Sequence, residues 1–263
     1  MKYILVTGAF GGMGRPTTEA LARNGFTVFA LDRKVEESGK NIIPVQADVT
    51  DEESVKLAFE KIKEQTEELY AVVHFAGIYM LDSLVEIDCK HFEKIFKVNL
   101  YGAFLVNRTF TPLLHSGSRI IMTTSELAPL DPLPFTGIYA VSKSALDKYA
   151  YSLRMELQLL GIYVSVLRAG AVKTDMLGAS TDALTTFCAN TSLYKYNAKR
   201  FRQVVDSVEA KSVAPEKISL AIIKILRKKN PSFAYAVNRN PLLRLLSLLP
   251  ARLQFRIIKA ILC

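Results

Sequence analysis

The sequence predicts an α/β fold, a doubly wound parallel sheet in a single domain with helices on both faces. Apolar, β-branched runs alternate with amphipathic stretches along the 263 residues, which is typical of successive βαβ units. A glycine-rich turn lies between the first apolar run and the first amphipathic stretch. A chain of this length can bury a large core, and no internal repeat or low-complexity linker divides it.

Each expected strand is a short apolar run, and each expected helix is amphipathic with start or stop signals at its ends. We predict strands at 3–7, 26–32, 42–46, 70–75, 118–123, 162–168 and 233–237. We predict helices at 13–24, 51–67, 88–111, 137–160 and 214–228. Thr50 is the expected N-cap of the second helix, Pro112 should end the third, and Gly161 should cap the fourth.

Composition narrows the function classes. Three cysteines (Cys89, Cys188 and Cys263) lie far apart without a CxxC or Cys/His cluster, which argues against a metal site and a disulfide scaffold. A reducing, cytoplasmic location is the simplest expectation. We expect no signal peptide and no spanning helix, because the first strand starts at residue 3 and no uncharged apolar stretch reaches about 18 residues. Despite the net charge of +9, no nucleic-acid motif is present and nucleic-acid binding is not expected.

The first functional signal is the pattern G-x-x-x-G-x-G directly after the strand at 3–7. Glycine permits a tight turn and lets backbone N–H groups approach a pyrophosphate at the N-terminus of the next helix. This strand–turn–helix context predicts a Rossmann-type dinucleotide site. Its expected cofactor contacts are Gly8, Phe10, Gly11, Gly12, Met13 and Gly14.

Asp32 closes the second predicted strand, 18 residues after Gly14. A carboxylate there can accept hydrogen bonds from ribose hydroxyls and repels a 2′-phosphate, so NAD is the expected cofactor. NADP remains possible because Arg33 or Arg15 could pair with that phosphate, and Asp32 could instead be an ordinary turn residue. Asp48-Val49 follows the third strand, where it suits the adenine, although Asp48 could also start a helix.

Tyr139 and Lys143 lie four residues apart on a predicted helix and therefore share one face. A free phenol has a pKa near about 10, which a neighbouring ammonium and an oxidised nicotinamide would lower. Tyr139 is then the general base for alcohol oxidation and the general acid for ketone reduction. Ser125, just past the strand at 118–123, can bind the reacting oxygen, with Thr124 as the alternative.

Together these motifs resemble the short-chain dehydrogenase/reductase family, in its Tyr-x-x-x-Lys subclass, over roughly residues 3–237. The resemblance implies that Asn99 relays a proton through water to Lys143, which also holds the nicotinamide ribose. It further implies a homodimer or homotetramer through the helices at 88–111 and 137–160. Further cofactor contacts implied by the resemblance are Ala76, Gly77, Gly170, Val172 and Thr174.

One departure from the family pattern lies at the end of the fourth strand, where Asn-Asn-Ala-Gly reads His74-Phe75-Ala76-Gly77. His74 is expected to be packed and hydrogen-bonded, whereas His91 and His115 should lie on the surface. We see no catalytic histidine and no metal site in the sequence.

The leading interpretation is an NAD(P)-dependent oxidoreductase for a hydrophobic, steroid- or lipid-like secondary alcohol or ketone. A 3-oxoacyl-thioester reductase and a non-catalytic dinucleotide-sensing protein are the alternatives. Segment 175–213 lacks clear periodicity and is expected to be a substrate lid or, alternatively, a surface excursion. The residues expected around the cleft are Leu127, Leu130, Leu133, Phe135, Met176 and Leu177.

The last predicted feature is a basic amphipathic extension at 239–263, which has five basic and no acidic residues. Leu253, Ile257 and Ile261 recur at helical spacing, and Pro250 can start a short helix. The extension could pack on the substrate lobe or a second subunit, or it could make peripheral contact with an anionic membrane.

Overall fold

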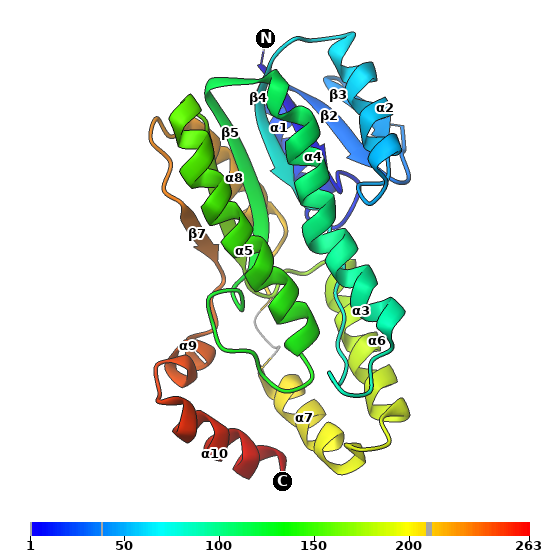
Figure 1. Cartoon of the computed structure of the whole chain (residues 1–263), viewed down its shortest axis with the longest axis vertical. Helices are drawn as coiled ribbons and strands as arrows, with labels where there is room; N and C mark the ends of the chain where they lie inside the picture. Colours follow the sequence, from blue (N-terminus) through cyan, green and yellow to red (C-terminus); the bar gives the residue numbers. More distant parts are fainter. Residues whose placement is uncertain (1, 38, 209–211) are drawn as a thin grey trace.

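The computed structural model describes residues 2–37, 39–208 and 212–263 and contains one sheet of seven parallel strands. The strand order is β3-β2-β1-β4-β5-β6-β7 (Figure 1). The strands are β1 (Lys2–Thr7), β2 (Phe26–Asp32), β3 (Ile42–Gln46), β4 (Leu69–His74), β5 (Leu114–Ser125), β6 (Tyr163–Ala169) and β7 (Ala234–Val237). All seven predicted strands are present, and the predicted doubly wound α/β fold is confirmed.

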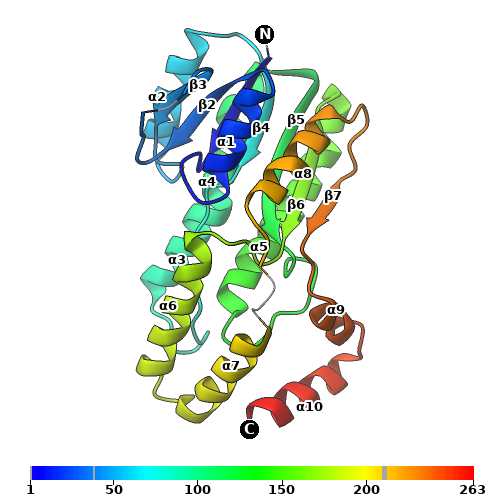
Figure 2. The ribbon, with the colours of Figure 1, turned by 180° about the vertical axis from the view of Figure 1, so that it is seen from behind.

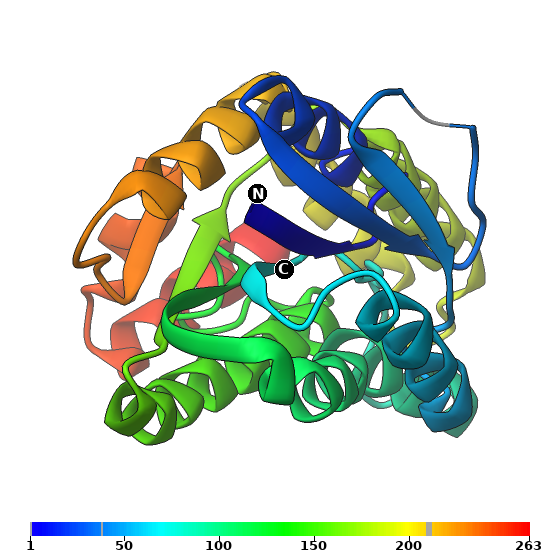
Figure 3. The same ribbon diagram turned by 90° about the horizontal axis from the view of Figure 1, so that it is seen from above.

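Helices cover both faces of the sheet, as a buried parallel sheet requires. On one side lie α1 (Gly14–Arg23) and α8 (Glu216–Arg227), and on the other α2 (Glu52–Lys63), α4 (Gly102–Phe110) and α5 (Gly137–Leu157), as Figure 3 shows. Alternate residues of one strand serve the two cores. In β1, Leu5 joins the core under α2, α4 and α5, whereas Ile4 and Val6 join the core under α1 and α8.

The strand order reverses between β1 and β4, because β2 and β3 extend the sheet on one side of β1 and β4 to β7 on the other. Ligands of open α/β sheets bind outside the carboxyl ends of the strands at such a switch point. The fold therefore places the loops after Thr7 and His74 where a cofactor would bind.

The helix predicted over 88–111 is wrong as a single element. It consists of α3 (Cys89–Phe96), a π-helical segment (Lys97–Tyr101) and α4, followed by a 3₁₀ turn at Thr111–Leu113. A π-helical turn inserts an extra residue and changes the direction of the side chains within it. Here that turn contains Asn99, whose side chain bonds to the backbone of Ile78 and to Ser142.

Two predicted caps have different outcomes. The cap of α2 is Asp51 rather than Thr50, since the Asp51 carboxylate accepts hydrogen bonds from the N–H groups of Glu53 and Ser54. Thr50 lies one residue before the cap position and donates its hydroxyl to Asp48. Gly161 ends the fourth predicted helix with φ of +74°, after a 3₁₀ turn at Gln158–Leu160, and is confirmed as its cap.

Four helices form a smaller lobe beyond the carboxyl ends of the strands (Figure 2). They are α6 (Asp175–Asn190), α7 (Lys195–Val208), α9 (Pro241–Ser247) and α10 (Ala251–Leu262), and we call them the C-terminal lobe. Residues 209–211 of the predicted lid lie outside the described residues. The lobe has its own small core: Leu81, Phe135, Leu184, Phe187, Ala198, Phe201 and Leu262.

Candidate active site

The turn after β1 requires glycine at three positions. Gly8 has φ of +66°, and a Cβ there would lie 2.5 Å from the backbone nitrogen of Ala76. A Cβ on Gly14 would lie 1.9 Å from the carbonyl oxygen of Gly8, and one on Gly12 would lie 2.5 Å from the Cβ of Thr174. The chain therefore approaches this turn closely from two directions, and the N-terminus of α1 is left open toward the loops after β1 and β4.

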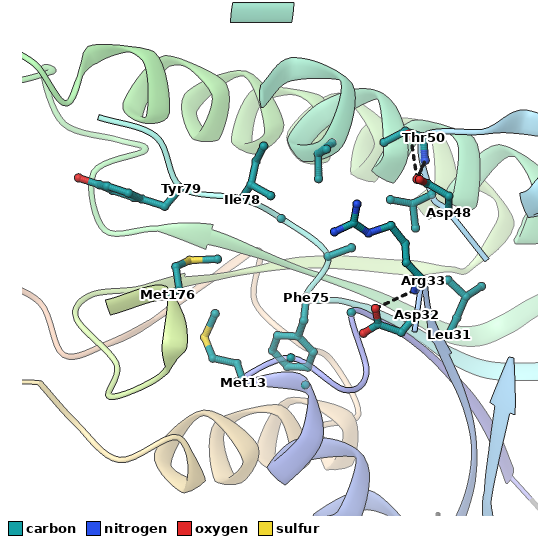
Figure 4. Close-up of a pocket in the computed structure, with 18 of the residues that line it drawn as sticks. Met13, Leu31, Asp32, Arg33, Asp48, Thr50, Phe75, Ile78, Tyr79 and Met176 are labelled. Atoms are coloured by element: carbon teal, nitrogen blue, oxygen red, sulfur yellow. Dashed lines mark hydrogen bonds between the residues drawn. The ribbon is translucent and has the colours of Figure 1, made fainter. Parts of the chain in front are cut away.

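A cavity of about 630 Å³ lies over the turn (Figure 4). Its walls come from the carboxyl ends of β1, β2, β3 and β4, from α3 and the π-helical segment, and from the start of α6. The sequence-predicted residues that line it are Gly8, Gly11, Gly12, Met13, Gly14, Asp32, Arg33, Asp48, Val49, Ala76, Gly77 and Thr174. Phe10 is absent from these walls, and its contribution is a backbone N–H donated to the Asp32 carboxylate at 3.0 Å.

Asp32 and Arg33 face the same end of this cavity. Besides the Phe10 N–H, the Asp32 carboxylate accepts the backbone N–H of Arg33 at 2.8 Å, so its position is fixed. The Arg33 side chain extends into the cavity (Figure 4). Arg15 is engaged elsewhere, in an ion pair with Glu36 at 2.7 Å. Arg33 is thus the basic group of this pair that lines the cavity.

Asp48 is held at the adjoining wall by Thr50, whose N–H and hydroxyl both donate to its carboxylate (2.8 and 2.7 Å). Burial raises the pKa of Asp48, but these hydrogen bonds and the charges of Arg33 and Lys97 outweigh it and leave the pKa below its usual value. Asp48 is therefore a carboxylate at neutral pH. A glycine cradle with two fixed carboxylates fits a dinucleotide with a pyrophosphate and ribose hydroxyls.

A second cavity, of about 300 Å³, adjoins the first and contains Ser125, Tyr139 and Lys143 in its walls. The two cavities have five wall residues in common, namely Met13, Phe75, Tyr79, Thr174 and Met176. A group bound at the inner end of the first cavity therefore faces the hydroxyl, phenol and ammonium of the second.

Tyr139 is a protonated phenol in this environment. Burial raises the pKa of Tyr139 to about 12, against the opposing effect of a hydrogen bond with Ser125. Thr124 donates its hydroxyl to Asp147 at 3.2 Å, so Ser125 and not Thr124 is the hydroxyl at the phenol. A protonated phenol and a second hydroxyl together suit the oxygen of a carbonyl.

Lys143 extends from α5 to the end of β5, where its ammonium donates to the carbonyl oxygen of Thr123 at 3.2 Å. Burial lowers the pKa of Lys143 to about 8. The nitrogen lies 5.8 Å from the centre of the Tyr139 ring. Its charge therefore favours the phenolate whenever Tyr139 loses a proton.

Asn99 is buried behind this group and lines neither cavity. Its amide accepts the N–H of Ile78 at 2.8 Å and donates to the Ile78 carbonyl and to Ser142 at 3.0 Å each. A Cβ added at Gly77 would lie 3.3 Å from both the Asn99 Oδ1 and the Lys143 Nζ. Asn99 and Lys143 therefore converge on Gly77 from two helices.

Gly170 and Val172, expected against the cofactor, line the second cavity rather than the first. Gly170 must be small because a Cβ would lie 1.9 Å from the carbonyl oxygen of Asn238 and 2.9 Å from a carboxylate oxygen of Glu126. Of the six apolar residues expected at the cleft, Leu127, Leu133, Met176 and Leu177 line this cavity. The expectation is wrong for Phe135 and Leu130, since Phe135 belongs to the core of the C-terminal lobe and Leu130 is absent from the wall.

Several wall residues of the second cavity were not predicted, and three of them bear on the site. The Tyr79 ring lies 4.8 Å from the Tyr139 ring, and Tyr79 follows Gly77 closely enough that its place after β4 could have identified it. Glu126 adjoins Ser125, and burial raises its pKa although its carboxylate accepts the N–H of Asn240. Leu243 on α9 joins the wall from 118 positions beyond Ser125, and no local pattern indicates it.

The three histidines lie as predicted. His74 is buried at the end of β4 with its Nε2 2.8 Å from the Asn107 Oδ1, and burial lowers its pKa to about 4. His91 and His115 are exposed.

Comparisons with known proteins agree with the fold and identify the family. The family model for short chain dehydrogenases matches residues 2–185. Estradiol 17-beta-dehydrogenase 2 of Mus musculus is 34% identical over 68% of this chain, and the match spans 50% of that protein's length. A 3-ketodihydrosphingosine reductase of Bacteroides thetaiotaomicron is 25% identical over 93% of this chain and 90% of its own. A short chain dehydrogenase of Burkholderia cenocepacia, solved with NADP, superposes with a TM-score of 0.75 at 22% identity, covering 98% of both chains.

Proposed function

The chain belongs to the short chain dehydrogenase family, and from this premise we propose that it transfers a hydride between NAD(H) and a hydrophobic secondary alcohol or ketone. The observation that carries the proposal is the junction of the two cavities. Ser125, Tyr139 and Lys143 line the smaller cavity, and that cavity adjoins the one over the glycine turn. A reacting carbon would lie between a nicotinamide on one side and these polar groups on the other.

In ketone reduction, the Tyr139 phenol donates its proton to the carbonyl oxygen while the Ser125 hydroxyl donates a hydrogen bond to the same oxygen. The nicotinamide, when bound, supplies the hydride. The pKa of about 12 keeps Tyr139 protonated at neutral pH, and the Lys143 ammonium stabilises the phenolate that remains. In alcohol oxidation the phenolate is the base, and its formation becomes easier as pH rises.

Asn99 is proposed as the positioning residue behind Lys143. Its amide holds the Ile78 backbone and Ser142, and it meets Lys143 at Gly77. A water bound between them would link Lys143 to the interior end of the site, as the family resemblance implies. Thr174 is proposed to contact the cofactor, because its side chain lies directly against Gly12 of the glycine turn.

The Asp32 carboxylate favours NAD(H), since both of its oxygens are held at the cavity wall and would repel a 2′-phosphate. Arg33 is the competing influence, and the Burkholderia cenocepacia relative was solved with NADP. Asp32→Ala is expected to shift the NADH-to-NADPH ratio of kcat/KM toward NADPH by at least about tenfold. A parent enzyme that already prefers NADPH would show that Arg33 dominates.

The substrate is proposed to be apolar and steroid- or lipid-like. The cavity wall is largely aliphatic, and α6 and α7 are proposed to cover it as the lid, contributing Met176, Leu177, Leu184 and Phe201. Estradiol and 3-ketodihydrosphingosine, named in two relatives, are both largely hydrocarbon. We therefore expect selectivity for large apolar ketones over sugars.

A homodimer or homotetramer through α4 and α5 is proposed. Large apolar side chains on these helices are exposed, with Phe104 at 38%, Val141 at 42%, Tyr151 at 55% and Met155 at 52%. Such a cluster on a helix face is typical of a protein interface. Light scattering at micromolar concentration should give the mass of two or four chains, and a monomer would contradict the proposal.

The reaction is tested with NADH and NADPH against a panel of steroid ketones, long-chain 3-ketones, 3-oxoacyl thioesters and ketoses. We expect cofactor oxidation with an apolar ketone and about 10²-fold lower kcat/KM with sugars. Preference for the acyl thioester would favour the alternative reductase. Binding of NAD(H) without turnover of any class would identify a dinucleotide-sensing protein instead.

A further inference from the structure

Helices α9 and α10 both expose large apolar side chains to solvent. Leu242, Leu245, Leu248 and Phe255 have exposed fractions of 63%, 61%, 80% and 69%. We call these four residues, together with the exposed basic residues Arg244, Arg252, Arg256 and Lys259, the docking face. Clustered exposure on this scale marks an interaction surface, since single apolar residues would otherwise be scattered.

The inner side of α10 is already occupied by the protein. Gln254 and Leu262 are buried, and Ile258 packs on the small core of the lobe. The Gln254 amide donates to Asp131 at 3.0 Å, and Asn197 of α7 donates to the Leu262 carbonyl at 2.8 Å. The helix is therefore held in a fixed orientation.

The apolar residues that recur at helical spacing in the sequence lie beside the stripe of α10 that packs inward. Leu253 and Ile261 are 43% and 45% exposed, and they flank the inward stripe of Gln254, Ile258 and Leu262. The docking face is thus presented outward with a further apolar margin along α10.

The charges of this face have one sign. Residues 239–263 contain no Asp or Glu, and all five of their basic residues are exposed. Within the part of the chain that the structure describes, no ion pair involves Arg244, Arg252, Arg256 or Lys259. Arg239 differs, because its charge acts on Glu126.

We propose that the docking face binds the surface of an anionic lipid bilayer. Leucine and phenylalanine side chains can enter the boundary of the acyl chains, while arginine and lysine reach the phosphate level of the headgroups. Among the helices that the structure describes, none combines the length and the hydropathy that a membrane span needs.

A second copy of this chain is the less suitable occupant. A twofold contact brings the same patch together from both subunits, so the four basic residues of one copy would meet the four of the other without an acid between them. Lipid phosphates supply the missing negative charge.

Helix α9 connects the docking face with the substrate cavity. Leu242 and Leu245 face solvent, whereas Leu243 and Asn240 line the cavity that holds Tyr139. A bilayer on the docking face would therefore be separated from the cavity by about the diameter of one helix, roughly 10 Å. An apolar substrate could then pass from lipid to cavity without crossing bulk water.

Docking is tested by co-sedimentation of the whole chain, without cofactor or substrate, with vesicles of phosphatidylcholine containing about 30% phosphatidylserine and with vesicles of phosphatidylcholine alone. Each basic residue near an anionic surface strengthens binding by about fivefold. We expect binding to the anionic vesicles that falls at least about tenfold in 0.5 M salt, because salt screens the charges.

Two variants locate the contact. Leu242→Ser/Leu245→Ser/Leu248→Ser removes exposed apolar groups, and Arg252→Gln/Arg256→Gln/Lys259→Gln removes three charges. Each should weaken vesicle binding at least about tenfold. The matched control Lys40→Gln/Lys61→Gln/Lys224→Gln removes three exposed charges elsewhere and should weaken it less than about threefold.

Three outcomes would overturn the proposal. They are no binding to anionic vesicles, equal loss in the charge variant and its control, or concentration-dependent dimers that the leucine variant alone abolishes. The last would assign the face to a second copy. Because cofactor and substrate are absent from the assay, failure of the proposed reaction would leave this result unaffected.

Discussion

Two regions of the molecule, the sheet around the glycine turn and the C-terminal lobe, are stabilised in different ways. Around the turn, strands β1, β2 and β4 have fully buried residues on both faces, and backbone atoms leave no room for a Cβ at Gly8 or Gly14. The C-terminal lobe has a core of only seven buried residues, two of which, Leu81 and Phe135, come from outside its helices, and hydrogen bonds of Glu86 and Gln254 join it to the rest of the chain. We infer that the region around the glycine turn is rigid and does not set substrate specificity. Substitutions in the lobe can change substrate specificity with little loss of stability in the rest of the fold.

The lobe depends most on Phe135, whose ring contacts those of Phe187, Tyr194 and Phe201 with centroids 4.6–5.3 Å apart. Phe135→Ala should destabilise the lobe by about 3–5 kcal/mol, because it leaves a cavity in the small core. Hydrogen exchange should rise in α6, α7 and α10 and stay unchanged in β1 to β5. Phe110→Ala, in the core under α4, is the control and should raise exchange throughout the sheet. Equal patterns for both variants would remove the distinction between the regions.

A substitution in the glycine turn should weaken cofactor binding. Gly14→Ala places a Cβ 1.9 Å from the Gly8 carbonyl oxygen, so the turn or α1 must shift. The NADH dissociation constant should rise about 100-fold, which is about 2.7 kcal/mol. Gly39→Ala meets nothing within 4 Å and should leave that constant unchanged. The dissociation constant is measured by NADH fluorescence. An unchanged value in Gly14→Ala would show that the turn can accommodate a Cβ without weakening cofactor binding.

His74 should make the stability of the sheet depend on pH between about 6.5 and about 4, a range in which Glu86 of the lobe attachment stays ionised. Its pKa is about 4 in the folded protein and about 6.5 when unfolded, so the unfolded chain takes up a proton first as pH falls from about 6.5 to about 4. This group therefore costs nothing at pH 7 and lowers the free energy of unfolding by about 2 kcal/mol at pH 5. Urea unfolding of the parent and of His74→Asn at both pH values isolates the contribution of His74 to the free energy of unfolding. An identical loss in both proteins would exclude His74 as its source.

Substitution of Glu86 should have the smallest effect of the changes considered, and that effect should be confined to the KM for substrate. Its carboxylate accepts hydrogen bonds from Thr191, Ser192 and Leu193 in the turn between α6 and α7, led by the Thr191 hydroxyl, which hold its pKa at about 2. Because it stays ionised at any pH above about 4, this attachment persists across the working range. Glu86→Gln should raise the KM for substrate about threefold and leave the KM for NADH unchanged, with Glu93→Gln as the exposed control. A matching rise in the KM for NADH would indicate a role in the cofactor cavity.

The difference between the regions also explains what could be predicted from sequence. The strands and the glycine turn depend on local requirements, namely an alternating apolar pattern and backbone space, so Gly8, Gly14 and Asp32 could be placed without coordinates. The Ser125, Tyr139 and Lys143 group could be placed because strand end and helix face are both local properties.

The parts that could not be predicted depend on contacts between distant segments. The π-helical turn at Asn99 needs partners at Ile78 and Ser142, and the role of Phe135 needs α6 and α7. The sequence did not decide which stripe of α10 packs inward, because two stripes adjoin, and only the contact with α7 decides between Leu253 and Gln254. No residue pattern within the segments themselves carries that information.

Tyr139→Phe tests the central claim most directly, since it removes one hydroxyl from the cavity that adjoins the proposed cofactor cavity. We expect kcat for ketone reduction to fall at least about 10²-fold while the NADH dissociation constant changes less than about twofold, because only proton transfer is lost. Tyr151→Phe, on the exposed side of the same helix, should keep full activity. Near-normal turnover in Tyr139→Phe, or a loss equalled by Tyr151→Phe, would contradict the account.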